Sequence, residues 1–165
     1  MATPRVFVSS TCYDLKYIRE NLKYFIRNIG YEPVLSEEGS VFYDPTKHTH
    51  ESCLVEVPNC QLFVLVIGGR FGGEFNGEIT SITNKEYREA INKKIPVFAL
   101  VDANVYSDHY IYTKNRKNHK IDYSKITYPS IDNHAIEIFN FIDEVRKQSI
   151  NNALIPFRDF NDIEN

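Results

Sequence analysis

Short apolar runs alternate along this chain with longer stretches of helical period, and this alternation limits the possible folds more than any other feature. Runs of this kind are apolar at nearly every position rather than at every second one, which is typical of strands covered on both faces. Five such strands are predicted: RVFVS at 5–9, EPVLS at 32–36, QLFVLVIG at 61–68, IPVFALV at 95–101 and ALIPF at 153–157.

The intervening segments have a period of three to four residues. From Asp14 to Gly30, apolar residues recur on one stripe, and Gly30 is well placed to end the helix. Further helices are predicted at about 49–58, 84–94 and 133–149. Residues 103–130 have no clean period and are expected to form an irregular excursion.

Alternating strands and helices predict an α/β domain in which helices cover both faces of a parallel sheet. Five strands fit the flavodoxin-like order 2-1-3-4-5. The 165 residues are expected to form one domain. The tail at 157–165 ends where a new helix is just beginning, which suggests that this domain is the N-terminal part of a longer protein.

Charge, cysteine content and the lack of long apolar runs bear on which partners and which compartment are expected. A net charge of −3 gives no overall attraction for phosphate backbones, so no nucleic-acid partner is expected. The one basic cluster, YTKNRKNHK at 112–120, is interpreted as a solvated loop. Three cysteines without metal-like spacing, no signal peptide and no run long enough to span a bilayer indicate a cytoplasmic protein without a membrane partner.

In such a sheet, a ligand binds at the carboxyl ends of the strands where the strand order reverses, which here is between the first and third strands. After the first strand, Ser9, Ser10 and Thr11 offer hydroxyls and amides suited to a phosphate or a ribose. Asp14 is either a ligand acceptor or the cap or first-turn acid of the following helix, and the structural role is the preferred interpretation.

The loop after the third strand is rich in glycine. Gly68, Gly69 and Gly72 either let the backbone approach a ligand closely or simply serve turns. Arg70 offers a guanidinium that is able to clamp an anion, although a lone loop arginine is more often solvated.

Glu86 begins the helix after this loop and should face the same crevice. Thr83-Asn84-Lys85-Glu86 also matches a capping box, in which Thr83 caps the helix and Glu86 bonds back to the cap amide. The sequence leaves both roles open for this carboxylate.

Other polar residues near the crevice are weaker candidates. Cys12 lies near a helix N-terminus but has no partner histidine nearby in sequence. The spacing of His48 and His50 matches no standard metal site, and no metal is predicted. The acidic residues at 37–44 are either supporting groups or solvated side chains.

VFVSSTCYDL at the start of the chain resembles the VF(I/V)SST-x-x-DL opening of a TIR-like domain family catalogued as a domain of unknown function. The resemblance continues through CQLFVLVIGGRFG and SITNKEYREAINKKIPVFALV and covers nearly the whole chain. It implies a TIR-like three-layer sandwich at the N-terminus of a signalling or defence protein, often ahead of an NTPase or repeat region.

Related TIR domains that hydrolyse NAD, and nucleoside deoxyribosyltransferases, place a catalytic glutamate on a comparable helix. The resemblance implies that Glu86 is the catalytic residue for cleavage of an N-glycosidic bond, with Arg70, Phe71 or Tyr87 near the nucleotide. No tightly bound cofactor is expected, and NAD or a related nucleotide would be the substrate or ligand. The alternative is a non-catalytic module that self-associates or reports to a downstream domain of the same chain.

Overall fold

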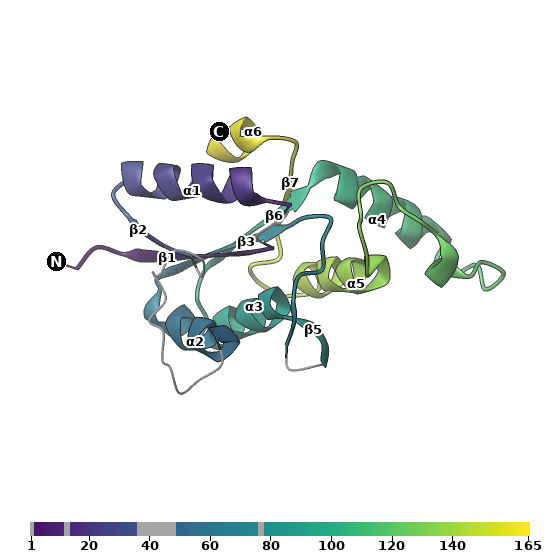
Figure 1. Cartoon of the computed structure of the whole chain (residues 1–165), viewed down its shortest axis with the longest axis horizontal. Coiled ribbons are helices and arrows are strands. Elements are labelled where there is room, and N and C mark those ends of the chain that lie inside the picture. The colour runs from purple at the N-terminus through teal and green to yellow at the C-terminus, as the bar shows by residue number, and fades with distance from the viewer. Residues whose placement is uncertain (1, 12–13, 36–48, 76–77) are drawn as a thin grey trace.

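The computed structural model describes residues 2–11, 14–35, 49–75 and 78–165. Its central sheet is parallel and contains five strands: β1 (Arg5–Ser10), β2 (Glu32–Val34), β3 (Leu62–Ile67), β6 (Val97–Asp102) and β7 (Leu154–Phe157). They lie in the order β2-β1-β3-β6-β7 (Figure 1). Numbered among themselves, they have the expected order 2-1-3-4-5, so the predicted α/β class is confirmed.

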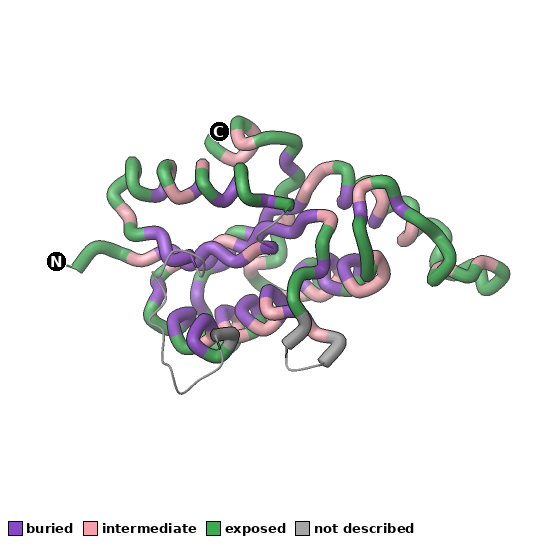
Figure 2. Tube along the Cα trace, viewed as in Figure 1, coloured by how far each residue is buried: buried purple, intermediate pink, exposed green. Residues whose placement is uncertain are grey.

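Helices cover both faces of the sheet. Helices α1 (Lys16–Asn28) and α6 (Phe160–Glu164) lie on one side in Figure 1, and α2 (Thr49–Glu56), α3 (Ile82–Asn92) and α5 (Ala135–Arg146) lie on the other. Strands β1, β3 and β6 are buried along most of their length (Figure 2), which explains why their sequences are almost continuously apolar. In β7, at the edge of the sheet, Phe157 alone is fully buried.

Alternate residues of each strand supply two separate cores. Phe7, Phe63 and Ala99 point toward α2, α3 and α5, and the rings of Phe7 and Phe63 stack with centroids 5.5 Å apart. Val8 and Leu100 point toward α1 and α6. Because consecutive residues of a strand face opposite sides, the last residues of β1 reach both helical layers.

The expected excursion at 103–130 is wrong for its first half. Residues 103–115 form a regular helix, α4 (Ala103–Asn115), whose N-terminal amides at Asn104 and Val105 bond to the Asp102 carboxylate. Only Val105 and His109 of this helix are fully buried, so its sequence carries no apolar stripe. A short 3-10 helix, η3 (Tyr123–Lys125), follows.

The glycine-rich segment expected as a loop contains a small hairpin. Strands β4 (Glu74–Phe75) and β5 (Glu78–Ser81) pair antiparallel, and Ser81 leads directly into α3. The 3-10 helix η2 (Val57–Asn59) follows α2 and completes the secondary structure of the described residues. No helix among these residues is long and apolar enough to cross a membrane.

Candidate functional site

The end of β1 places three consecutive hydroxyls beside three charged side chains. Ser9 donates a 2.5 Å hydrogen bond to Oε2 of Glu86 on α3. Ser10, on the opposite face, accepts a 2.6 Å bond from Nη1 of Arg19 on α1. Thr11 donates to the Asp14 carboxylate. The structure thus brings the predicted residues Ser9, Ser10, Thr11, Asp14 and Glu86 to one edge of the sheet.

Glu86 is not part of a capping box. Helix α3 begins at Ile82, and its N-cap is Ser81, whose hydroxyl accepts from the backbone N–H of Asn84 at 3.2 Å. Thr83 is therefore already inside the helix, and Glu86 lies more than one turn from its start. The carboxylate of Glu86 is directed to Ser9, and the residue is only 5% exposed.

The prediction that Asp14 caps the first helix is also wrong. Helix α1 begins at Lys16, its N-cap position is Leu15, and that position makes no side-chain cap bond. Asp14 is exposed, and its carboxylate is directed to Thr11 instead. The contact joins Thr11, just after β1, to a residue two positions before α1.

Sequence reasoning missed Arg19. It is 2% exposed and donates to both the hydroxyl and the backbone carbonyl of Ser10, at 2.6 and 3.3 Å. Its position on the helix offers a signal, because residue 19 lies next to the apolar stripe of Leu15, Ile18 and Leu22. A charged residue on the buried side of an amphipathic helix indicates a specific polar contact.

The glycines after β3 allow close contact between protein segments. A Cβ at Gly68 would lie 2.5 Å from Oδ2 of Asp14, and one at Gly69 would collide with the carbonyl oxygen of Ser130. Gly72 has a φ of +89°, which disfavours any other residue. Part of the space predicted for a ligand is therefore filled by the chain itself.

Two aromatic residues predicted near the nucleotide belong to the core. Phe71 is buried beside the ring of His134. Tyr87 is fully buried against Phe141, and burial, with a smaller contribution from Glu144, raises the pKa of its phenol to about 12. The side chain of Tyr87 therefore points from α3 into the core and does not lie at an open site.

Arg70 remains at the surface. Its Nε lies 2.7 Å from Oδ2 of Asp132, and both side chains are substantially exposed. Because the pair is solvated, it contributes little to stability, and the guanidinium is accessible to an incoming anion.

A cleft of about 220 Å³ opens at the carboxyl ends of β3 and β6. Its lining combines carboxylates, one guanidinium and backbone from three loops: Asp14, Leu15, Gly68, Gly69, Arg70, Asp102, Asn104, Ser130 and Asp132. A smaller cavity of about 20 Å³ lies beside it between Thr11, Phe71 and Asn84 and has room for no more than a water molecule. The cleft is therefore the larger of these two spaces at the predicted edge.

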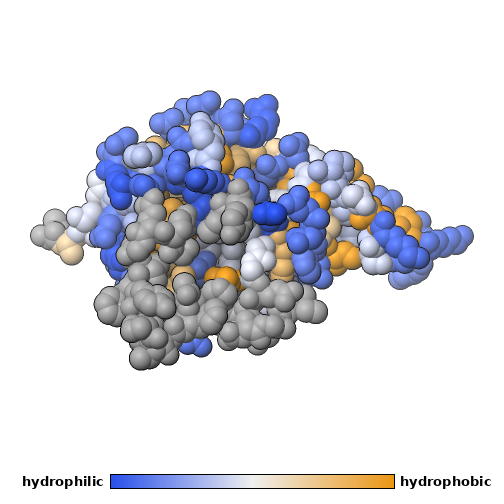
Figure 3. All heavy atoms as spheres, in the orientation of Figure 1, coloured by the Kyte–Doolittle hydropathy of each residue, from blue (hydrophilic) through white to orange (hydrophobic). Residues whose placement is uncertain are grey.

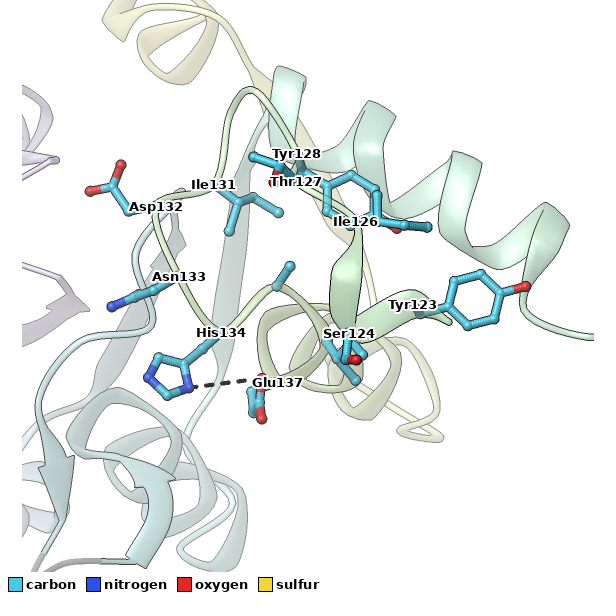
Figure 4. Close-up of a pocket in the computed structure, with 12 residues that line it drawn as sticks. Tyr123, Ser124, Ile126, Thr127, Tyr128, Ile131, Asp132, Asn133, His134 and Glu137 are labelled. Carbon is cyan, nitrogen blue, oxygen red and sulfur yellow. Dashed lines mark ion pairs between the residues drawn. The ribbon is translucent and has the colours of Figure 1, made fainter. Parts of the chain in front are cut away.

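A separate cavity of about 370 Å³ lies beneath the segment 123–137. Figure 4 shows Ile131, His134 and Glu137 among its lining residues, with His134 Nδ1 and Glu137 Oε2 3.9 Å apart. It is formed by residues that the sequence did not single out.

Several sequence-based candidates lie outside the described residues. These are Cys12, the acidic residues at 37–44 and His48; the side chain of His50 is not described either. Cys53 and Cys60 are buried, and burial raises the pKa of Cys60 to about 11. Among the residues that are described, no group of three or more His, Cys, Asp or Glu side chains is arranged to hold a metal ion.

Comparison with known proteins places the chain in one family. No curated protein and no solved structure matches it significantly. A family model described as a domain of unknown function, DUF4062, matches residues 5–165. This match spans the sheet, the β1 hydroxyls, Glu86 and the cleft, and the chain therefore belongs to the DUF4062 family.

Proposed function

We propose that this domain is a TIR-like signalling or defence module that binds a nucleotide, with NAD as the candidate, at the carboxyl ends of β1 and β3. The observation that carries the proposal is the pairing of Ser9 with Glu86, which holds a carboxylate at the position where strand order reverses. The cleft at the same edge of the sheet, whose lining includes neither Ser9 nor Glu86, supplies the exposed guanidinium of Arg70 and the Asn104 side chain as donors for phosphate and ribose oxygens.

The chemistry proposed for Glu86 is cleavage of an N-glycosidic bond. In NAD, the bond between ribose C1′ and the nicotinamide nitrogen breaks, and the bonding electrons leave with nicotinamide. A carboxylate beside C1′ stabilises the developing positive charge, and water adds to C1′ to give ADP-ribose and a proton. The hydrogen bond from Ser9 fixes the carboxylate so that it need not reorganise during the reaction.

A non-catalytic function is the second candidate and has an observation in its favour. Glu86 is 5% exposed, and its carboxylate is already engaged by Ser9. In this alternative, the Ser9–Glu86 pair is structural, and the domain acts in protein interaction or assembly and reports to a C-terminal effector or NTPase.

NAD turnover by the concentrated domain tests the two functions, with products separated by chromatography. Glu86→Gln keeps an acceptor for Ser9 and removes the negative charge. Glu89→Gln, about one turn further along α3, is the matched control, because among the described residues Glu89 forms an ion pair with Lys93 alone, at 3.9 Å. Nicotinamide release that is lost in Glu86→Gln and retained in Glu89→Gln supports catalysis.

Binding measurements separate the remaining outcomes. Saturable NAD binding by calorimetry without turnover supports a nucleotide-binding module in which Glu86 is not catalytic. Neither binding nor turnover by a protein with a normal melting transition contradicts the nucleotide proposal and favours the assembly function.

A further inference from the structure

The C-terminal end of α4 and the loop after it project beyond the body of the domain (Figure 1). Residues 110–126, called here the α4 tip, contain five Lys or Arg side chains and one Asp, a formal charge of +4. Since the whole chain carries −3, the rest of it carries −7. The domain therefore has a strongly uneven charge distribution that its net charge conceals.

Part of this positive charge is not neutralised within the protein. Arg116 pairs with Asp143 at 2.7 Å, and Lys125 pairs with Asp122 at 3.4 Å. Lys117 and Lys120 are exposed and form no ion pair with any residue that the structure describes. Their ammonium groups are available to an anionic partner.

Apolar side chains lie exposed among these lysines. Tyr110 is 62% exposed, Ile111 55% and Ile126 39%. Lys114 extends over the ring of Tyr110, with its ammonium 5.2 Å from the ring centroid. Figure 3 shows hydrophilic and hydrophobic residues intermixed toward this projecting end. The α4 tip thus combines aliphatic, aromatic and cationic groups on a convex surface.

The α4 tip has an ordered conformation. The Tyr123 hydroxyl donates to the backbone carbonyls of Asn115 and Asn118, and the Asn118 N–H bonds to the Asn115 carbonyl at 2.8 Å. Tyr112 packs between Tyr123 and Phe139 and joins the tip to the core. Ordering before contact reduces the entropy lost when the surface meets a partner.

We propose, in place of the expectation from the sequence that there is no membrane partner, that the α4 tip docks on a bilayer that contains anionic phospholipid. Lysines near such a surface are attracted to lipid phosphates and carboxylates, while Tyr110, Ile111 and Ile126 enter the boundary between head groups and acyl chains. The −7 carried by the remainder of the chain is repelled by the same surface, so the domain approaches with the tip foremost.

Nucleic acid fits this surface less well. Proteins that bind single strands stack bases on aromatic rings and contact phosphates with arginine. Here Arg116 is held by Asp143, Tyr112 is packed into the core, and two of the three exposed apolar side chains are isoleucines. Isoleucine offers no stacking surface but favours entry into a lipid interface. This inference does not depend on the proposed nucleotide site.

Co-sedimentation with vesicles tests the proposal. The 165-residue protein is mixed with phosphatidylcholine vesicles with or without phosphatidylserine at low salt. Binding is expected only to the phosphatidylserine vesicles. Lys117→Glu with Lys120→Glu should lower the partition coefficient about 30-fold or more, because each lysine contributes about fivefold. Lys16→Glu with Lys93→Glu, on α1 and immediately after α3, makes the same change in charge away from the tip and should bind nearly as the parent protein does.

A second pair, Ile111→Ser with Ile126→Ser, tests entry into the lipid. It leaves every charge in place and should also weaken binding to phosphatidylserine vesicles several-fold. Equal binding to both vesicle types, no binding at low salt, or binding unaffected by the isoleucine substitutions would overturn the proposal. Tighter binding to a single-stranded oligonucleotide through the same two lysines would overturn it in favour of nucleic acid. Thermal melting confirms that each variant is folded.

Discussion

The hydroxyl of Ser9 lies 2.5 Å from the carboxylate of Glu86, although 77 positions separate the two residues in sequence. The contact links the C-terminal end of β1 to α3. It lies on the face of the sheet that carries the larger core. On the other face, the neighbouring contact between Ser10 and Arg19 links the same strand to α1. The end of β1 therefore holds both helical layers through polar groups.

Removal of the Ser9 hydroxyl should destabilise the fold measurably. Ser9→Ala leaves a buried carboxylate without this donor, and the expected loss is about 1–3 kcal/mol in the free energy of unfolding, measured with urea. Ser107→Ala is the control, since that hydroxyl is exposed and donates to the carbonyl of Ala103 within its own helix. Similar losses in both variants would mean that the Ser9–Glu86 bond contributes nothing special.

The position of the α3 cap gives a second prediction. Ser81→Ala removes the hydroxyl that accepts from Asn84 N–H and should cost about 1 kcal/mol. Thr83→Val removes a hydroxyl that does not cap the helix and keeps the side-chain shape, so its effect should stay within about 0.5 kcal/mol. Chemical denaturation measures the loss of unfolding free energy in both variants. A larger loss in Thr83→Val than in Ser81→Ala would restore Thr83 as the cap.

Two glycines of the same loop should respond differently to a methyl group. Gly69→Ala directs Cβ into the Ser130 backbone carbonyl, and the expected cost is about 1–3 kcal/mol together with a distorted cleft. At Gly73 the nearest atom to a new Cβ is the terminal methyl of Ile82 at 3.3 Å, which is able to move aside. Thermal melting of the two alanine variants should therefore show a clear loss only at position 69; equal melting temperatures would contradict the packing argument.

The buried His109 should make stability depend on pH. Burial lowers the pKa of its imidazole, although the Asp143 carboxylate partly opposes the shift, and Arg146 and Arg116 act in the same direction as burial. The unfolded chain therefore gains a proton at a higher pH than the folded protein does. The stability linked to His109 is complete above the ordinary histidine pKa of about 6.5 and falls as pH decreases below it.

Unfolding free energies at pH 7.5 and 5.5 test this dependence. His109→Phe keeps a ring between Tyr106 and Phe139 and should show a smaller decrease between the two pH values than the parent protein. The carboxyl of Asp143 does not titrate in this window, because hydrogen bonds from His109 and Arg116 outweigh burial and lower its pKa below the usual range. His119→Gln, at an exposed site, should behave like the parent; a parallel decrease in all three proteins would contradict the prediction.

The strands and their order were predictable because a parallel sheet covered on both faces imposes nearly continuous apolar runs, as in β3 (Leu62–Ile67). Helix α4 was not predictable in this way. Its buried residues are few, its exposed face includes Tyr110 and Ile111, and its capping residue Asp102 also ends a strand. Periodicity detects a helix only when packing imposes an apolar stripe.

Within the candidate site, the location of the polar residues was more predictable than the partner that each of them contacts. The fold class alone places Ser9 and Glu86 at the same edge of the sheet. Ser9 lies at the C-terminal end of β1, Glu86 lies on the helix that comes after β3, and the strand order reverses between these two strands. The partner of each hydroxyl depends on the alternation of side chains along β1 and on the rotation of α3. A local motif, Thr83 to Glu86, suggested a cap that the tertiary contact with Ser9 replaces.

Helix α4 has one further consequence. Its first turn is bonded to Asp102 at the rim of the cleft, and its last turn carries Lys114, about 20 Å away at 1.5 Å per residue. Such a rod acts as a lever: a tilt of about 5° at the Asp102 end displaces the far end by about 2 Å. Asp143 restrains this lever, since it is bonded to His109 at the middle of α4 and to Arg116 just after its end. Any tilt of α4 must therefore strain or break the bonds to that one carboxylate.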